Sequence, residues 1–342
     1  MPAVTIKDVA EHARVSIATV DRVLHDRNGV SAKARNRVKE AVRELGFGQL
    51  PKSLTRYSRG RLRFLFLLPS LETGFVVQMV DAIRRAQAAL PDVEVLIDIK
   101  RVSLGDCSDL IAALEALDIQ RYDGVGLFAV DAPGVRTSID DVVASGLPVV
   151  TIVSDVPNAQ RAGFAGIDNV AAGRTAARLM GRFLRGVSGE VGIIVGDMSI
   201  RDHVERHMGF RQILGADYRD LKPLAYLEGG SYAARNRAHV MDLLADTPRL
   251  AGLYSIGAGN SGIIAALKEV DPARRPVTIM HELTSATRTA LNAGWIDAVI
   301  GQDAGHIARS AVRQLAAKAL GDDTNPEQER IRIDVFLAEN LL

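Results

Sequence analysis

The sequence contains very little cysteine and no long apolar run. The single cysteine, Cys107, excludes an intramolecular disulfide and favours a reducing compartment. No stretch of 18 residues is uninterruptedly apolar, and no signal peptide is recognisable at the N-terminus. These absences predict a cytoplasmic protein that does not associate with a membrane.

The familiar catalytic patterns are also missing. The sequence has no G-x-S-x-G nucleophile motif and no Walker phosphate loop, and its carboxylates are scattered as surface charge usually is. His203 and His207 have the i, i+4 spacing of two metal ligands on a helix, but no third ligand follows at a suitable distance. We therefore expect no enzymatic activity, no bound metal and no cofactor.

The whole chain has almost no net charge, but its two parts carry opposite charges. The formal net charge is only +1, yet residues 1–63 hold 14 Lys/Arg against 6 Asp/Glu, and the remaining residues hold 28 against 35. A basic head of +8 thus precedes an acidic body of −7. Such a head is suited to phosphate binding by counterion release, and repulsion keeps the body away from a polyanion.

The basic head reads as three short helices. Thr5 with Asp8 forms a capping-box pattern before the first helix, Ser16 can cap a second helix, and Ser31 can cap a third that Gly46 ends. Only residues 13–15 separate the first two helices, which is short enough for a helix-turn-helix corner. Such a corner places the second helix in the major groove of duplex DNA. A solvated three-helix bundle is the alternative interpretation.

Beyond residue 61, short apolar runs alternate with helical stretches. Nearly continuous Val/Ile/Leu runs separated by helices are typical of parallel strands buried on both faces. Ten such runs are too many for one sheet of ordinary size, so the sequence predicts two α/β lobes whose facing loops enclose a cleft. The runs are residues 62–68, 93–99, 124–129, 148–153, 164–167, 191–195, 224–227, 250–256, 277–280 and 297–300.

A glycine-rich segment supplies a rival interpretation. Residues 257–262, G-A-G-N-S-G, fit the dinucleotide pattern G-x-G-x-x-G between an expected strand and an expected helix, and Glu282 follows 20 residues after Gly262. This arrangement would suit NAD(P), as in a dehydrogenase-like or redox-sensing protein with a DNA-binding head. The motif sits at the eighth strand, however, and no catalytic Tyr-x-x-x-Lys follows it. Close packing of the βα turn, or a small-ligand contact at Asn260, remains open as well.

The head closely resembles the headpiece of the LacI/GalR family of bacterial transcription regulators. The resemblance rests on T-I-K-D-V-A-E-x-A-x-V-S-x-x-T-V-x-R-V-L, then V-S-A-K and L-G-F, over about 45 residues. It implies that Ile17, Ala18 and Arg22 meet base edges, Arg22 through a bidentate contact to guanine. Other polar residues would face phosphates, namely Thr5, Ser16, Thr19 and Asn28.

Two positions depart from the family pattern. Asp21 stands where the family usually has Ser, and it would orient Arg22 or accept from a cytosine amine. In the following segment, 49–61, the family folds a hinge helix on DNA and inserts a Leu into the minor groove. Here Arg56 holds that position, with Leu54 nearby. A basic linker that stays unfolded is the alternative.

The body, residues 62–342, resembles the sugar-binding modules of periplasmic binding proteins and of this regulator family. The resemblance is sharpest at S-D-V-P (154–157), G-I-D-N-x-x-A-G-R (166–174), E-R-x-x-G-F (205–210), I-M-H-E-L-T (279–284) and V-I-G-Q-D (299–303). It implies that Arg206 grips the ligand, and that His281 replaces a usual Asp and so admits an anion such as a sugar acid. The implied effector-binding residues are Phe75, Asp131, Asp155, Arg206, Tyr232, Asn260, His281, Glu282 and Gln302.

Together these features predict an α/β protein with an N-terminal three-helix helix-turn-helix domain at residues 1–48, a hinge or linker at 49–61, and a two-lobed periplasmic-binding-protein-like domain with parallel sheets at 62–342. The expected function is that of a transcriptional regulator, more specifically a repressor. A homodimer would bind a pseudo-palindromic DNA operator and respond to a sugar, polyol or sugar acid bound between the lobes.

Overall fold

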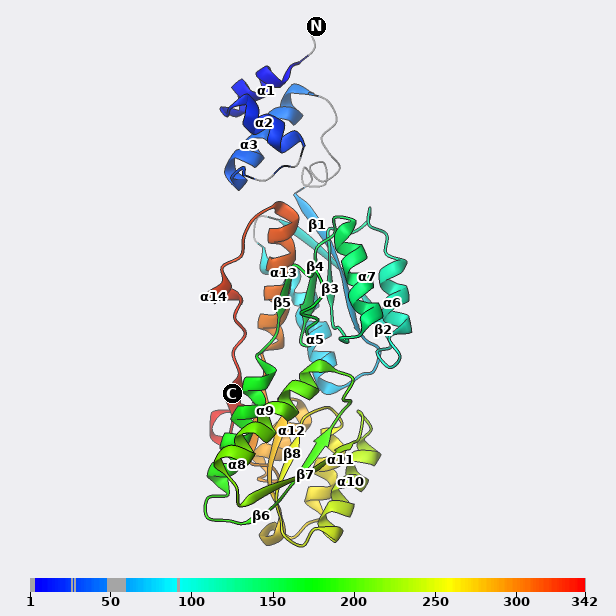
Figure 1. Cartoon of the computed structure of the whole chain (residues 1–342), viewed down its shortest axis with the longest axis vertical. Coiled ribbons are helices and arrows are strands. Elements are labelled where there is room, and N and C mark those ends of the chain that lie inside the picture. Colours follow the sequence, from blue (N-terminus) through cyan, green and yellow to red (C-terminus); the bar gives the residue numbers. More distant parts are fainter. Residues whose placement is uncertain (1–3, 26, 28, 48–59, 91–92, 342) are drawn as a thin grey trace.

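The computed structural model describes residues 4–341 apart from 26, 28, 48–59 and 91–92 (Figure 1). Its N-terminal part consists of α1 (Ile6–Ala13), α2 (Ile17–Leu24) and α3 (Ala32–Leu45). Apolar side chains from all three helices, including Val9, Val20 and Val38, form a small core with no exposed surface at these positions. The predicted three-helix head is confirmed, whereas Asn28, Leu54 and Arg56 lie outside the described residues.

The first lobe is built on a five-stranded parallel sheet with the order β2-β1-β3-β4-β5. Helices α5 and α13 cover one face, and α6 and α7 cover the other (Figure 1). The elements are β1 (Arg61–Pro69), α5 (Gly74–Arg85), a 3₁₀ turn (Ala86–Ala89), β2 (Glu94–Val102), α6 (Ser108–Glu115), β3 (Gly124–Leu127), α7 (Pro133–Ala144), β4 (Val149–Ile152), β5 (Gly163–Ala165) and α13 (Ala304–Leu320).

The second lobe contains a six-stranded sheet with the order β11-β10-β9-β8-β6-β7. Helices α8 and α9 pack on one face, and α10, α11 and α12 pack on the other. The elements are α8 (Asn169–Phe183), β6 (Gly189–Val195), α9 (Arg201–Asp217), β7 (Leu221–Glu228), α10 (Ala233–Asp246), β8 (Leu250–Ser255), α11 (Asn260–Lys268), a 3₁₀ turn (Pro272–Arg274), β9 (Val277–His281), α12 (Ser285–Asn292), β10 (Ala298–Gly301), β11 (Asp334–Phe336) and a 3₁₀ turn (Ala338–Asn340).

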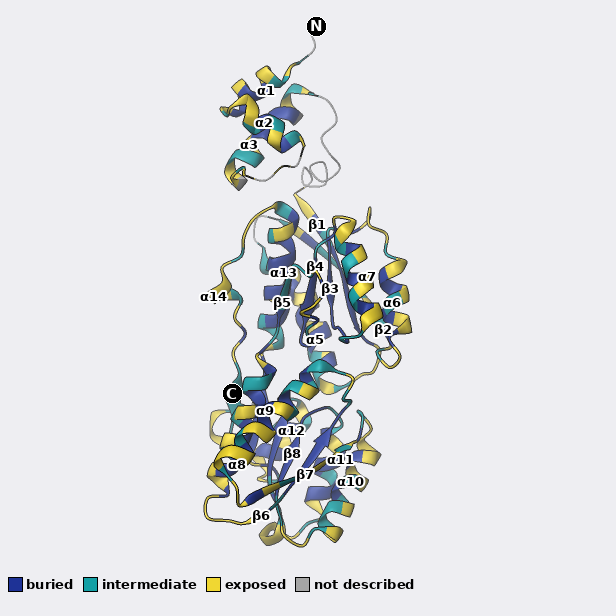
Figure 2. Cartoon of the chain, viewed as in Figure 1, coloured by how far each residue is buried: buried dark blue, intermediate teal, exposed yellow. Residues whose placement is uncertain are grey.

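The apolar runs form strands because both faces of each sheet are covered. In β1, Phe64 and Phe66 enter the cluster under α5 and α13, whereas Leu65 and Leu67 enter the cluster under α6 and α7. Figure 2 shows the central strands buried, and the edge strand β7 and the outer helix faces largely exposed. All ten expected strands are present. The sequence did not predict β11, the one antiparallel strand in the described part of the sheets.

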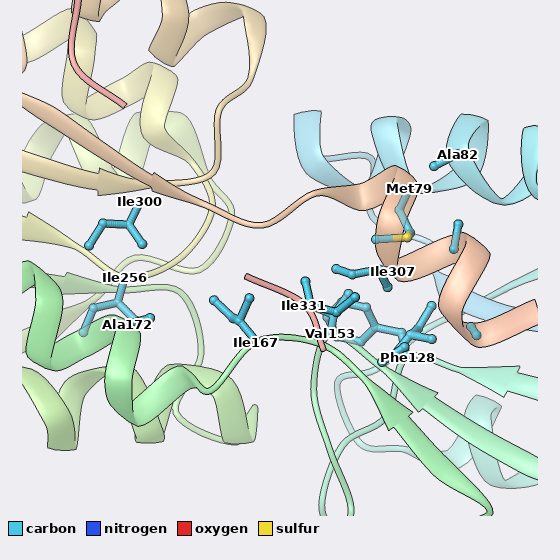
Figure 3. Packing of buried hydrophobic residues seen from close by; sticks show 14 of the residues in the cluster. Met79, Ala82, Phe128, Val153, Ile167, Ala172, Ile256, Ile300, Ile307 and Ile331 are labelled. Carbon is cyan, nitrogen blue, oxygen red and sulfur yellow. The ribbon is translucent and has the colours of Figure 1, made fainter. Parts of the chain in front are cut away.

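Three segments connect the two lobes. The chain passes from β5 to α8 near Ile167, from β10 to α13 near Gln302, and through the strap that carries α14 (Pro326–Glu329) to β11. Apolar side chains fill the junction: Ile167 and Ile331 belong to a cluster that includes Val153 of the first lobe and Ile256 of the second (Figure 3). Within the described residues, no helix is both long enough and apolar enough to cross a lipid bilayer.

Candidate DNA-binding and effector-binding sites

Helix α2 exposes the residues that the head offers to a partner. Its inner face packs Val20 and Val23 into the three-helix core, where neither has exposed surface. On the outer face Ile17 is 53% exposed, and Ala18 and Arg22 are also exposed. The outer face of α2 thus offers an apolar and a basic side chain, which are suited to a thymine methyl group and to guanine, respectively.

Two of the polar residues predicted to face phosphates, Thr5 and Ser16, cap helices of the head. Thr5 accepts from the Asp8 amide at 3.3 Å while the Asp8 carboxylate accepts from the Thr5 amide at 2.7 Å, which completes the capping box. Ser16 accepts from the Thr19 amide at 3.1 Å. Arg14 adopts a left-handed φ of 51° at the corner between α1 and α2. These caps fix the corner that projects α2.

Asp21 pairs within its own chain. Its carboxylate lies 3.1 Å from the His25 ring and 3.3 Å from the Arg27 guanidinium, beyond the end of α2. Among the described residues no bond joins Asp21 to Arg22. The acid therefore neutralises charge at the end of α2 instead of orienting the neighbouring arginine.

In the second lobe, Arg206 of α9 is the centre of a buried polar cluster. The residue is 2% exposed. Its Nε donates to the Asn169 side chain at 2.8 Å, one terminal nitrogen donates to the Ile256 carbonyl at 3.2 Å, and the other donates to Glu282 at 3.3 Å. Asp202, one turn earlier on α9, lies 3.6 Å from the same guanidinium. A buried guanidinium requires this density of acceptors.

Two glycines allow Arg206 to reach Asn169. A Cβ on Gly173 of α8 would lie 2.0 Å from the Arg206 carbonyl oxygen, and one on Gly209 of α9 would lie 2.1 Å from the Val170 carbonyl oxygen. Helices α8 and α9 therefore touch backbone to backbone, and any side chain at these positions would separate them.

Glu282 links the cluster to the lobe junction. It follows β9 with a left-handed φ of 69°, an unusual conformation for a residue with a side chain, and it accepts from the Gln302 amide at 2.9 Å. Burial raises the pKa of its carboxyl above the usual value, although Arg206 and Gln302 oppose that rise. Since Glu282 already binds Arg206 and Gln302, it is not placed as a free acid for a ribose.

His281 lies behind the cluster and carries no charge. It has no exposed surface, and its Nε2 shares a hydrogen bond of 2.7 Å with the Tyr254 hydroxyl. Burial holds the pKa of His281 well below its usual value, and the Arg206 charge acts in the same direction. The predicted attraction of His281 for an anion such as a sugar acid would therefore depend on a hydrogen bond from the imidazole and not on a positive charge.

The glycine-rich segment 257–262 packs the protein against itself. A Cβ on Gly262 would lie 1.8 Å from the Ala233 carbonyl oxygen, and one on Gly257 would lie 2.5 Å from the Gly196 nitrogen. Asn260 accepts from Ser255 at 2.7 Å and donates to the His281 carbonyl at 2.9 Å, joining the ends of β8 and β9. These contacts account for the glycines through close packing of the turn, without a dinucleotide.

Several buried polar atoms around Arg206 lack a partner. Within the described part of the chain, Asp202 Oδ1, Gln302 Oε1 and His281 Nδ1 have no hydrogen-bond partner. An unpaired buried polar atom costs about 1–3 kcal/mol. Asp202 and Gln302 contact the cluster directly and His281 precedes Glu282, so these atoms offer free hydrogen-bonding capacity to a polar ligand or to water.

The acids of the first lobe are already paired. Asp131 accepts from Arg136 at 2.7 Å and from Arg201 of α9 at 2.9 Å, so this carboxylate bridges the two lobes. Burial alone would raise the pKa of Asp131, but the bonds from both arginines outweigh it and lower the pKa. Asp155 likewise receives both ends of Arg161.

The other predicted residues are spread out. Phe75 is half-buried in the first turn of α5, next to Gly74, where a Cβ would lie 2.9 Å from Thr284 of the second lobe. Tyr232 is 59% exposed, with the Arg235 guanidinium 5.2 Å from its ring centre, so it does not join the buried cluster. The potential metal ligand His203 instead bonds the Asp197 backbone at 2.8 Å.

Five of the residues predicted to bind the effector lie near one another in the second lobe, namely Arg206, Glu282, Gln302, His281 and Asn260. The structure adds four residues that sequence reasoning missed: Asn169, Asp202, Arg201 and Tyr254. Asn169 lies inside the motif G-I-D-N, and Asp202 lies one helical turn before Arg206. The motif and the one-turn spacing were visible in the sequence, but neither indicated that the residue binds Arg206.

The fold and the sites define a class of protein: a two-lobed α/β ligand-binding body joined to a helix-turn-helix head. Residues 64–323 match the model of the periplasmic binding protein domain, and residues 5–48 match that of the bacterial regulatory proteins of the lacI family. The chain thus belongs to the periplasmic binding protein domain family and carries the lacI-family head, which confirms the predicted resemblance. LacI-family regulators are not enzymes, in agreement with the expected lack of enzymatic activity.

Individual proteins give the same picture. The ribose operon repressor of Halalkalibacterium halodurans is 34% identical over 79 residues, 23% of this chain and 24% of that protein. The HTH-type transcriptional repressor CytR of Escherichia coli is 40% identical over 83 residues, 24% of each chain. These matches span about a quarter of the length of the curated relatives. The structure of GanP, a glucose-galactose binding protein from Geobacillus stearothermophilus, has a TM-score of 0.72 at 19% identity and covers 82% of this chain and 99% of its own.

Proposed function

We propose that the protein is a ligand-responsive transcriptional repressor. Residues 1–48 bind an operator, and residues 62–342 bind an effector and form a homodimer. Residues 49–61 connect these two parts. Two heads of a two-fold dimer bind a pseudo-palindromic site. The protein acts in the cytoplasm, where the DNA is.

One combination of observations carries this proposal. The same chain exposes an apolar and basic face on α2 and holds three unpaired polar atoms around Arg206 near the lobe junction. The bond of 2.9 Å from Arg201 to Asp131 joins the two lobes, so a change in the angle between the lobes would lengthen or break it. An effector that binds one lobe arrangement better shifts the protein towards it and alters the spacing of the heads. Such coupling is typically worth about 1–3 kcal/mol.

The effector that suits the cluster best is a neutral sugar or polyol. Asp202 Oδ1 and Gln302 Oε1 are hydrogen-bond acceptors, so the ligand must supply donors, as hydroxyl groups do. The nearby arginines are paired with carboxylates and offer no free positive charge to an acid. The names of the ribose operon repressor and the glucose-galactose binding protein point to the same class of ligand.

The test of the DNA-binding role is selection of operator sequences from random duplexes by the full chain and by the Arg22→Ala variant. We expect the parent to select a pseudo-palindrome, and the variant to lose about 1–3 kcal/mol of binding free energy and to relax one base position in each half-site. Arg185→Ala, which removes an exposed arginine of the second lobe and gives the same net charge, is the matched control. Identical motifs with and without Arg22 would contradict the base-reading assignment.

The effector is identified by a thermal-shift screen of neutral sugars, polyols and sugar acids, followed by calorimetry. We expect a neutral compound to bind and to change operator affinity. Tight binding of sugar acids alone would overturn the proposed ligand class while leaving the DNA-binding role intact.

A further inference from the structure

A hollow of about 850 Å³ lies under the strap that leads through α14 to the second lobe. It is separate from the cluster around Arg206, because none of its lining residues belongs to that cluster. Its walls come from β5, the start of α8, α13 and the strap. They include Phe164, Asp168, Gln314, Arg330, Ile331 and Arg332.

Two arginines and two acids lie on the walls of the hollow. Arg330 and Arg332 are exposed, and in the described ranges neither has a carboxylate within the 4.0 Å of an ion pair. The acids on the walls are engaged elsewhere. Arg313 binds both oxygens of Glu329 at 2.7 and 2.8 Å, and Asp168 caps α8 by accepting from the Ala171 amide at 2.9 Å. Two guanidinium groups therefore remain for an anion.

Apart from Gln314 and Thr324, the remaining wall is apolar. The Phe164 ring packs against Gly166, where a Cβ would lie 2.2 Å from its Cζ, so only glycine leaves the ring in this position. Pro326, Ile331 and Ile333 complete the apolar part. An aromatic ring and aliphatic side chains beside two unpaired guanidinium groups fit a ligand with an apolar body and one anionic group.

We propose that this hollow binds a small organic anion, a carboxylate or phosphate monoester on a compact apolar body. The site lies where two of the three lobe connections pass, at Asp168 after β5 and at Ile331 before β11. A ligand here contacts both connections at once, so its affinity depends on the angle between the lobes.

The experiment is calorimetric titration of the full chain with phenyl phosphate and with benzoate, using benzyl alcohol as the uncharged counterpart. We expect saturable binding of the two anions and none of the alcohol. The double variant Arg330→Gln/Arg332→Gln should weaken binding at least 10-fold, and Phe164→Leu should weaken it while leaving the charge unchanged.

The matched control is Arg185→Gln/Arg274→Gln, which removes two exposed arginines elsewhere and gives the same net charge. It should bind the probes as the parent does. Circular dichroism confirms that each variant is folded. Absence of saturable binding by both anions at 10 mM would overturn the site. So would equal losses in the two double variants, which would show attraction by net charge alone.

Discussion

The close contact between α8 and α9 predicts that the same substitution, glycine to alanine, changes the free energy of unfolding in opposite directions at two positions of α9. Both Gly209 and Gly215 lie in α9, and alanine is the better helix former at either place by about 1 kcal/mol. At Gly215 an added Cβ meets nothing within 4 Å. At Gly209 it would lie 2.1 Å from the Val170 carbonyl oxygen, a backbone atom that no rotamer change can move.

The magnitude follows from that distance. An ordinary contact begins near 3.4 Å, so the two helices must separate by about 1.3 Å locally. Overpacking of this kind costs about 1–3 kcal/mol, and the separation also weakens the bond of Arg206 to Asn169, worth about 1 kcal/mol. After subtraction of the helix-propensity gain, Gly209→Ala should lower the free energy of unfolding by about 1–3 kcal/mol. Gly215→Ala should raise it by about 0.5–1 kcal/mol.

The chain contains its own probe for this measurement. Its single tryptophan, Trp295, belongs to the second lobe, as α8 and α9 do, and it packs against Lys268. Urea unfolding followed by tryptophan fluorescence should place the Gly209→Ala midpoint roughly 0.5 M below the parent and the Gly215→Ala midpoint above it. If both variants shift the midpoint in the same direction, the close approach of α8 and α9 is not what requires glycine at 209.

Three further predictions concern single side chains. Asp131→Asn removes the carboxylate charge that binds Arg136 and Arg201, so the effector-free lobes should open. The radius of gyration from small-angle scattering should then rise, whereas Asp140→Asn, outside this bridge, should leave the radius unchanged. The free energy of unfolding should fall below pH 6.5 by up to about 1.4 kcal/mol per pH unit, because burial holds the pKa of folded His281 well below that of the unfolded chain. In urea titrations His281→Gln should flatten this pH dependence, and an unchanged slope would refute the assignment to His281. Gln302→Leu should weaken effector binding about 10-fold or more in calorimetry without changing operator affinity in the absence of effector, because Gln302 is buried between Glu282 and an unpaired oxygen; an unaltered effector affinity would remove it from the site.

The elements could be predicted from sequence because their signals are local. Ten apolar runs became ten strands, and Thr5, Ser16 and Gly46 mark helix ends as expected. Strand β11 was missed because its three residues, paired antiparallel at an edge, carry no periodicity.

The partners of the site residues were not predictable in the same way. Arg201 reaches Asp131 across 70 positions of sequence, and Arg206 reaches Glu282 across 76. Neither pair has a spacing that sequence patterns encode. The sequence therefore pointed to Asp131 as an effector-binding residue but not to the two arginines that its carboxylate binds.

The order in which the chain is made bears on how the two lobes arise. Helix α13 packs on the first-lobe sheet yet follows β10 of the second lobe, and β11 then returns to the second-lobe sheet. During synthesis the strands β1 to β5 and helix α5 emerge more than a hundred residues before α13, the second helix on the same sheet face. At about 5–20 residues per second this face stays only partly covered for several seconds or longer. We therefore expect the nascent first lobe to be the stage most exposed to aggregation, and mutations of the buried residues of α13 to lower the yield in cells as well as the stability of the folded protein.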